Sequence, residues 1–149
     1  MKKLFLISSL ALVFFTNKLI AQDIRQNQVP SLIVNNFQKT FPKAFDVEWE
    51  LEGENYKVEF ETGLLGKDYN VWYNKRGKLI RYKKEIAKSE LPQKVQAKIN
   101  SDFKTYRIDD LEEIFQGNNI TYKVELKSIS QDWKVVFDGS GNVLSKQVD

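Results

Sequence analysis

Tyr56-Lys57-Val58-Glu59-Phe60 is the stretch that decides the fold of this 149-residue chain, and it returns as Tyr122-Lys123-Val124-Glu125-Leu126. In both copies apolar residues alternate with charged residues, which is the period of a β-strand with one buried face and one open face. Residues 46–52 alternate in the same way before Gly53-Glu54. Glycine in the first central position favours a type II′ turn, so we predict a hairpin between these stretches.

The register of this hairpin follows from its two-residue turn. It places Trp49 opposite Val58 and Val47 opposite Phe60, so the apolar side chains share one face. Paired carboxylates can catalyse glycoside hydrolysis in a cleft, but glutamates that alternate along exposed strands usually only keep a face solvated. We therefore predict an open, charged face without catalytic residues. Its carboxylates are Glu48, Glu50, Glu52, Glu59 and Glu61.

Two apolar stripes at helical spacing precede the strands. Residues four apart lie on one face of a helix, so each stripe indicates an amphipathic helix. Pro30 and Pro92 suit a first helical turn, where the missing N–H is not needed. We predict helices over 30–41 and 92–103 that bury these stripes. The stripes are Val29, Ile33, Phe37 and Phe41, and then Leu91, Val95, Ile99 and Phe103.

Two further hairpins complete the pattern, each with glycine at the left-handed position of a three-residue turn. The predicted fold is α+β, with helices packed on one face of an antiparallel sheet. It consists of two tandem repeats, residues 29–84 and 91–149, each of one helix plus about four antiparallel strands. The hairpins are 69–74 with 78–83 around Lys75-Arg76-Gly77, and 133–138 with 142–146 around Gly139-Ser140-Gly141.

Residues 1–21 have the three-part pattern of a secretory signal peptide. A basic start precedes an apolar run from Leu4 to Phe15, and Ala21 is a suitable cleavage point. The run is shorter than the roughly 20 residues that span a bilayer, so no stable membrane span is expected after cleavage. We predict that 22–149 forms a single domain in the periplasm or outside the cell. Its first residues, 22–28, are polar and predict a loose leader.

Composition excludes several kinds of function. The segment 1–21 holds three of the 23 basic residues and none of the 20 acidic ones, so 22–149 carries 20 of each and no net charge. Because a nucleic-acid site needs clustered positive charge, we expect no nucleic-acid partner. The chain has neither cysteine nor histidine, which excludes disulfides, thiol nucleophiles, Ser-His-Asp triads and the usual zinc sites. Asp138-Gly139-Ser140-Gly141-Asn142 resembles the start of a calcium loop, but Val143 stands where glycine is required. We therefore predict a protein that is not an enzyme and that has no metal and no cofactor.

Three residues on the open face are candidates for contact with a partner. The predicted alternation places Trp72, Ile80 and Tyr82 together on the face opposite the core, with Trp72 near Ile80 across the hairpin. Aromatic residues on an open sheet face are typical anchors at protein interfaces. Dimerisation or a neighbouring loop that covers these residues is the alternative explanation.

Several short motifs recur along the chain, and they are Val29-Pro30, Phe41-Pro42, Trp49, Tyr56 to Phe60, Tyr73 to Leu79, Leu91-Pro92, Tyr122 to Leu126 and Phe137 to Asn142. These motifs resemble the PepSY-like family of Bacteroidetes, whose members are described as β-lactamase-inhibitor-like. The resemblance covers nearly all of 29–149 and implies a secreted or periplasmic, non-catalytic protein. The second copy departs from the family pattern where Phe41-Pro42 becomes Phe103-Lys104. The motifs mark helix ends and turns, and a shared fold does not imply inhibition of a particular enzyme.

These observations predict a binding module, and an inhibitor is one form of it. The open sheet face would hold a protein or peptide, with Trp72, Ile80 and Tyr82 as anchors and the glutamates as a polar rim. The alternative is a carrier of a small apolar ligand in a pocket between helices and sheet. That pocket would be lined by Phe37, Trp49 and Phe60. The identity of the partner and the oligomeric state do not follow from the sequence.

Overall fold

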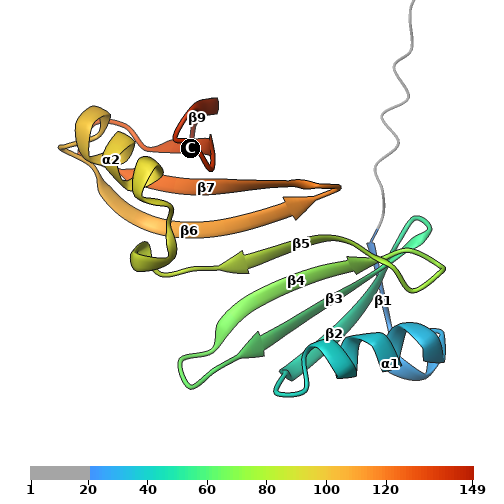
Figure 1. Ribbon diagram of the computed structural model, residues 1–149. Helices are drawn as coiled ribbons and strands as arrows, with labels where there is room; N and C mark the ends of the chain where they lie inside the picture. Colours follow the sequence, from blue (N-terminus) through green and yellow to red (C-terminus); the bar gives the residue numbers. More distant parts are fainter. Residues whose placement is uncertain (1–20) are drawn as a thin grey trace, which may run out of the picture.

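A single antiparallel sheet of nine strands and two α-helices makes up the fold of residues 21–149, the part of the chain that the computed structural model describes (Figure 1). The strands lie side by side in their order along the chain. The strands are β1 (Ala21–Ile24), β2 (Phe45–Glu52), β3 (Asn55–Thr62), β4 (Lys67–Tyr73), β5 (Leu79–Glu85), β6 (Arg107–Gln116), β7 (Asn119–Lys127), β8 (Trp133–Asp138) and β9 (Val143–Val148). The helices are α1 (Ser31–Thr40) and α2 (Gln93–Asp102), with short 3-10 turns η1 (Gln26–Gln28) and η2 (Lys88–Glu90).

The predicted fold of two tandem repeats, each of one helix plus about four strands, is wrong. β5 pairs with β6 from Arg81 opposite Gln116 to Glu85 opposite Glu112, so the sheet continues across the predicted boundary. An edge strand leaves backbone N–H and C=O groups without partners, and β6 supplies those partners to β5. The result is one continuous sheet rather than two helix-plus-strand units.

β1 is a second departure from the prediction, because its residues were expected to form a loose leader. The strand pairs with β2 from Ala21 opposite Glu52 to Ile24 opposite Trp49. Three of its four side chains are exposed, so backbone pairing rather than side-chain burial forms this strand. The predicted signal peptide lies outside the described residues, apart from Ala21.

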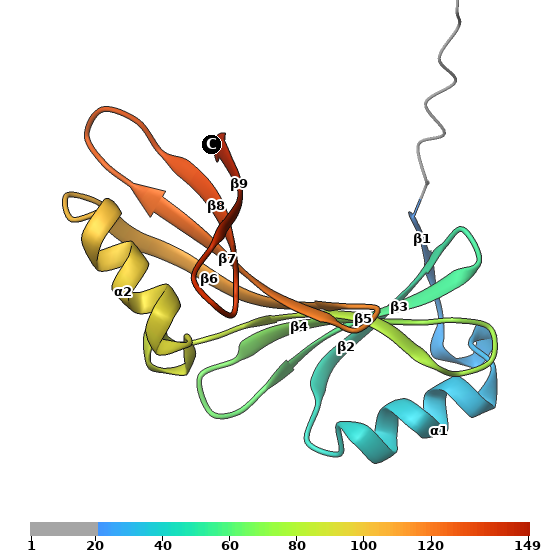
Figure 2. The ribbon, with the colours of Figure 1, turned by 45° about the horizontal axis from the view of Figure 1, so that its top comes forward.

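The two helices agree with the predicted ranges, and Pro30 and Pro92 directly precede them. Each helix buries two apolar residues of its predicted stripe against its own part of the sheet. The buried side chains form two clusters, and α1 and α2 lie far apart in both views (Figures 1 and 2). Around α1 the cluster is Val29, Ile33, Phe37, Trp49, Val58, Phe60, Val71 and Tyr73. Around α2 it is Ile86, Leu91, Val95, Ile99, Phe103, Leu111, Tyr122, Val124, Leu126, Val135 and Phe137.

One face of the sheet carries both clusters. Directly opposed residues of antiparallel strands point to the same side. The pairing of Val71 with Tyr82, and of Tyr82 with Phe115, therefore continues the core face from β4 to β6. Both helices pack on that side, and within residues 21–149 no helix covers the other side, which we call the open face.

Most of the predicted register of the first hairpin is confirmed. Trp49 pairs with Val58 across the two-residue turn, and Gly53 has a positive φ of 61°. The predicted pairing of Val47 with Phe60 is not formed, because the register shifts between Phe45 and Glu48. Asp46 lies in this irregular segment with φ of 49°, a conformation uncommon for a residue other than glycine.

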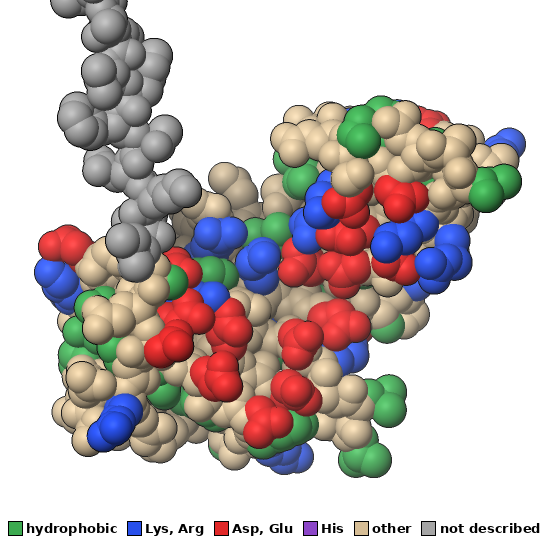
Figure 3. Space-filling model, turned by 180° about the vertical axis from the view of Figure 1, so that it is seen from behind, with side chains coloured by type: hydrophobic (Ala, Val, Ile, Leu, Met, Phe, Trp, Pro, Cys, Tyr) green, Lys and Arg blue, Asp and Glu red, His purple; other side chains and the backbone are tan. Residues whose placement is uncertain are grey.

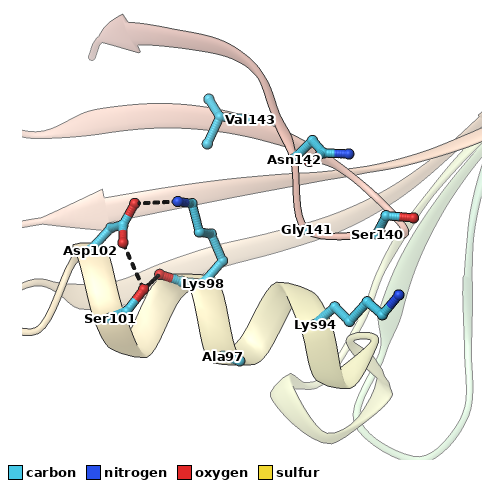
Figure 4. A pocket seen from close by; sticks show the side chains of 9 residues that line it. All are labelled: Lys94, Ala97, Lys98, Ser101, Asp102, Ser140, Gly141, Asn142 and Val143. Carbon is cyan, nitrogen blue, oxygen red and sulfur yellow. Dashed lines mark hydrogen bonds and ion pairs between the residues drawn. The ribbon is translucent and has the colours of Figure 1, made fainter.

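The turn between β8 and β9 packs closely against α2 (Figure 4). Gly141 has φ of 85°, and a Cβ atom there would lie 2.8 Å from the carbonyl oxygen of Lys94. The turn between β4 and β5 contacts α1 in a comparable way, since the Asn36 side-chain amide donates a hydrogen bond of 2.9 Å to the Gly77 carbonyl. Each helix is therefore held by a hairpin turn as well as by its apolar stripe.

Gly141→Ala should destabilise the fold. The substitution places a side chain in a left-handed conformation and against backbone of α2, so we expect a loss of about 2 kcal/mol or more in the free energy of unfolding. Urea denaturation followed by circular dichroism measures this loss. Gly139→Ala is the matched control in the same turn, because a Cβ there meets nothing within 4 Å. Equal stability of the two variants would contradict the close packing of the turn.

Tyr73 adds a pH-dependent contribution to stability. Its hydroxyl is buried without a hydrogen-bond partner among residues 21–149, and burial raises the pKa of Tyr73 to about 12. The unfolded chain ionises this group near its ordinary pKa of 10.0, whereas the folded chain keeps it neutral. The contribution is therefore complete below pH 10 and is lost as the pH rises toward 12.

Tyr73→Phe should make the protein relatively more stable in alkali. Between pH 8 and pH 11 we expect the free energy of unfolding to fall by about 1 kcal/mol less in the variant than in the wild type. Urea denaturation of both proteins at the two pH values measures the difference. The same pH dependence in both proteins would show that Tyr73 ionises normally in the folded state.

Candidate functional site on the open face

Trp72 lies at the centre of the open face, between Lys57 on β3 and Arg81 on β5. The guanidinium carbon of Arg81 is 4.5 Å from the centroid of the indole ring, and the Lys57 Nζ atom is 5.8 Å from it. The indole Nε1–H donates a hydrogen bond of 2.8 Å to the Glu52 carboxylate. The residue is only 8% exposed, because charged side chains cover a ring that belongs to neither apolar cluster.

Lys57 is the centre of an ion-pair group beside Trp72. Its Nζ atom lies 3.2 Å from a Glu50 oxygen and 3.8 Å from a Glu52 oxygen, and it also pairs with Glu59. Burial would lower the pKa of Lys57, but hydrogen bonds to Glu59 and Glu50 outweigh it and raise the pKa above its ordinary value. The ammonium group therefore holds three carboxylates together.

Lys123 on β7 forms the counterpart of this group. Its Nζ atom lies 3.0 Å from a Glu112 oxygen and 3.1 Å from a Glu125 oxygen. On the next strand, however, Lys123 faces Val136, whereas Lys57 faces Trp72. The charged group is present at both Tyr-Lys-Val-Glu strands, and the covered tryptophan belongs to only one of them.

Carboxylates also oppose one another directly across neighbouring strands of the open face. Like charges in directly opposed positions destabilise a sheet, yet this face has several such pairs. Figure 3, which shows the molecule from behind, has acidic side chains gathered in a band across this side. The opposed pairs are Glu48 with Glu59, Glu61 with Asp68, and Glu85 with Glu112.

Two shallow pockets, of about 360 and 270 Å³, lie along this band and share Asp68 and Asn70. Asp110 lines the second, and burial, helped by the charge of Glu112, raises the pKa of Asp110. Among the residues that the structure describes, no acidic side chains are grouped as metal ligands would be. The pockets offer carboxylate and amide oxygens that accept hydrogen bonds from a basic ligand.

The three predicted anchors are not brought together. Trp72 is on the open face as predicted, but Tyr82 lies on the opposite face, where it stacks on Phe115 at 5.3 Å between ring centroids. The Tyr82 hydroxyl donates a hydrogen bond of 2.7 Å to Glu113. Ile80 has no directly opposed partner on β4, and the residue opposite Trp72 is Arg81.

A β-bulge causes this difference. Tyr73 pairs with Leu79, but Trp72 pairs with Arg81, so Ile80 is an extra residue on β5. Strict alternation along β5 fails at such a point, and every later side chain changes face. The residues of the candidate site that the sequence analysis missed, Arg81 above all, follow this bulge. Gly77, which is left-handed in the three-residue turn, is the sequence feature that indicates the bulge, since such turns are commonly completed by one.

The alternative pocket between α1 and the sheet is filled by side chains. Phe37 contacts the ring of Trp49 at 5.4 Å and the ring of Phe60 at 5.0 Å between centroids, both edge to face. All three residues are at most 4% exposed. These rings form close-packed core rather than the lining of a cavity, so the structure gives the carrier hypothesis no support.

A single antiparallel sheet, with helices on one side and a charged open face on the other, places the molecule among α+β proteins that present a sheet surface. A sequence model described as "Putative beta-lactamase-inhibitor-like, PepSY-like" matches residues 16–81 and 54–145. Because these matches span most of the chain, the protein belongs to the PepSY-like family. This confirms the predicted family, and its description indicates a non-catalytic binding module without naming a partner.

Solved structures from Bacteroides share the fold. A BLIP-like protein from Bacteroides fragilis superposes with a TM-score of 0.65 at 19% identity, over 80% of this chain and 85% of that chain. A protein from Bacteroides eggerthii, described among "putative periplasmic proteins", has a TM-score of 0.69 at 16% identity, over 80% of this chain and 88% of that chain. A DUF2874 family protein from Bacteroides uniformis has 0.67 at 15%, over 80% and 88%. No curated protein matches the sequence.

Neither α-helix of residues 21–149 has the length and apolar composition that a membrane crossing requires.

Lys57→Met should destabilise the open face while keeping the shape of the side chain. Without the ammonium group, Glu50, Glu52 and Glu59 repel one another, and we expect a loss of about 1–2 kcal/mol in the free energy of unfolding. The loss should shrink in 1 M NaCl, because salt screens the repulsion. Urea denaturation at low and high salt measures both effects, with Lys57→Arg as the control that retains the charge. A loss that is independent of salt would show that Lys57 acts by packing alone.

Proposed function

We propose that this protein is an extracytoplasmic binding module that holds a protein or peptide on the open face of its sheet. The opposed carboxylates of β2 to β6 carry the proposal, because like charges in directly opposed positions reduce the stability of a sheet. Lysine ion pairs offset part of this repulsion at Glu59 and Glu112, whereas no ion pair within residues 21–149 joins Glu61 or Asp68 to a lysine or arginine. A partner that presents lysine or arginine side chains relieves this repulsion and is attracted from a distance. Binding then gains free energy because the partner relieves a repulsion between carboxylates that is present in the free protein.

Trp72 is the proposed apolar anchor of this face. Arg81 covers the ring, and the Nε atom of Arg81 is buried without a hydrogen-bond partner among residues 21–149. A carbonyl of the partner that accepts a hydrogen bond from this atom would satisfy it and draw the guanidinium aside. The indole ring would then meet the partner, as tryptophan does at the centre of many interfaces. Tyr82 has no part in this proposal because it lies on the other face.

The proposed location is the periplasm or the cell exterior. The three-part pattern of residues 1–21 supports it, as does the description of the neighbour from Bacteroides eggerthii. An inhibitor of an enzyme is the narrower form of the proposal, and it rests on the description of the family alone.

Photo-cross-linking from two opposite sides of the molecule tests the proposal. Benzoylphenylalanine replaces Asn70, which lines both acidic pockets, in one protein, and Gln38 on the exposed side of α1 in a second. Each protein is exported in the cell of origin, irradiated and analysed for cross-linked partners. We expect a specific adduct from position 70 that position 38 does not give, and its yield should fall at high salt.

A matched pair of variants separates binding from folding. Glu61→Gln with Asp68→Asn removes one opposed pair of charges without changing side-chain volume, and it should weaken the position-70 adduct at least fivefold. Thermal unfolding should show the same or higher stability, since the substitution removes repulsion. An adduct that is equally strong in this variant, or that also forms from position 38, would contradict binding at the open face.

A further inference from the structure

β9 has one free edge within residues 21–149, because it pairs only with β8. The Asp149 N–H donates a hydrogen bond of 3.1 Å to the Asp132 carbonyl of the preceding loop. Backbone groups alternate in direction along an antiparallel strand, so those of the adjacent Val148, and of Lys146, point away from β8. They form a short row of donors and acceptors that another strand can pair with.

β5 shows how this chain completes such an edge. β5 and β9 have the same bulge, with Ile80 as the extra residue in one strand and Leu144 in the other. On its second edge β5 pairs with β6 over five residues. Lys84 of β5 is also neutralised by β6, since its Nζ atom lies 3.1 Å from a Glu113 oxygen. Among residues 21–149, the equivalent edge of β9 has neither a paired strand nor a carboxylate of such a strand.

The side chains of β9 are unusual for a free edge. Natural edge strands are commonly protected by charge, proline or a covering element. β9 has one such charge, Lys146, but it also exposes Val143, Leu144 and Val148 by 41%, 57% and 59%. Val143 also borders an open groove between the β8–β9 turn and α2, together with Lys94 and Lys98 (Figure 4). A strand added to β9 would cover apolar surface that now faces water.

Lys146 defines the charge that such a strand should carry. Its Nζ atom lies 4.0 Å from the ring centroid of Trp133 and 5.3 Å from that of Phe103. Within the described residues this ammonium makes no ion pair within 4 Å, although after hydrogen bonds from Lys98 and Ser101 its charge also helps to lower the pKa of Asp102 on α2. A carboxylate on the opposing strand would complete the site, as Glu113 does for Lys84 on β5.

We propose that β9 binds an extended peptide segment of a partner protein by strand addition. The segment pairs with the free backbone groups of β9 and places an acidic side chain opposite Lys146 and an apolar side chain opposite Val148. This surface is the edge of the sheet, so it is separate from the open face and goes beyond the function proposed above.

A synthetic peptide tests strand addition directly. The probe is an acetylated and amidated heptapeptide with valine, glutamate and valine at positions 2, 4 and 6 and threonine elsewhere. Added at up to 5 mM to ¹⁵N-labelled protein of residues 22–149, it should shift the amide signals of 144–148 and leave those of β1 unchanged. Replacement of its glutamate by lysine should weaken binding at least fivefold.

Val148→Pro is the decisive variant, because proline removes an outward N–H and leaves the bonds to β8 in place. We expect binding of the probe to weaken at least tenfold in this variant, whereas Val148→Ala, which keeps the N–H, should lose less than threefold. Should Val148→Pro unfold, two N-methylated probes replace it. In one probe the methylated nitrogens are those that face β9, and this probe should not bind. In the other the methylated nitrogens face away from β9, and this probe should bind as before.

Three results would overturn the proposal. The first is that the amide signals of β9 stay unchanged at 5 mM probe. The second is that the probe binds the proline and alanine variants equally and that both N-methylated probes still bind the wild type. The third is that the wild type self-associates as its concentration rises and that Val148→Pro abolishes this association. The last result would assign the edge to a second copy of this chain. Analytical ultracentrifugation of the wild type and the variant distinguishes it.

Discussion

The alternation of Lys57 and Glu59 with Val58 is the constraint on which the rest of the structure depends. One strand must bury aromatic and aliphatic side chains on one side and keep an ammonium group and carboxylates on the other. A helix can pack only on the first side, because burial of the charged side would leave ions without water. Both helices therefore occupy the same side, and the open face follows from the sequence of the strand rather than from a missing element.

The parts of the fold that could be predicted from the sequence are those set by local periodicity. Ile33 and Phe37 mark one helix stripe, and Gly53 marks a tight turn, so α1 and the first hairpin could be located. The position of Trp72 on the open face followed in the same way. Predictions of side-chain direction from strict alternation were wrong beyond any extra residue in a strand. Ile80 is such a residue, and beyond it the face of Tyr82 was wrong and the covering role of Arg81 was missed.

The pairing of strands that lie far apart in the sequence could not be predicted from side-chain patterns. β1 is polar and mostly exposed, and it exists because the edge of β2 offers backbone partners. The junction of β5 and β6 likewise satisfies backbone groups, which carry no residue-specific signal. Periodicity identified two similar sets of elements but did not show that their strands join edge to edge. The family resemblance was confirmed because its motifs mark turns and helix ends, the features that local sequence determines best.

The division of the core into two clusters has a mechanical consequence. The clusters are linked mainly by the five residue pairs of β5 and β6 and by the stack of Tyr82 on Phe115. Within residues 21–149 a single strand pairing, that of β5 with β6, therefore carries any force between the two cores.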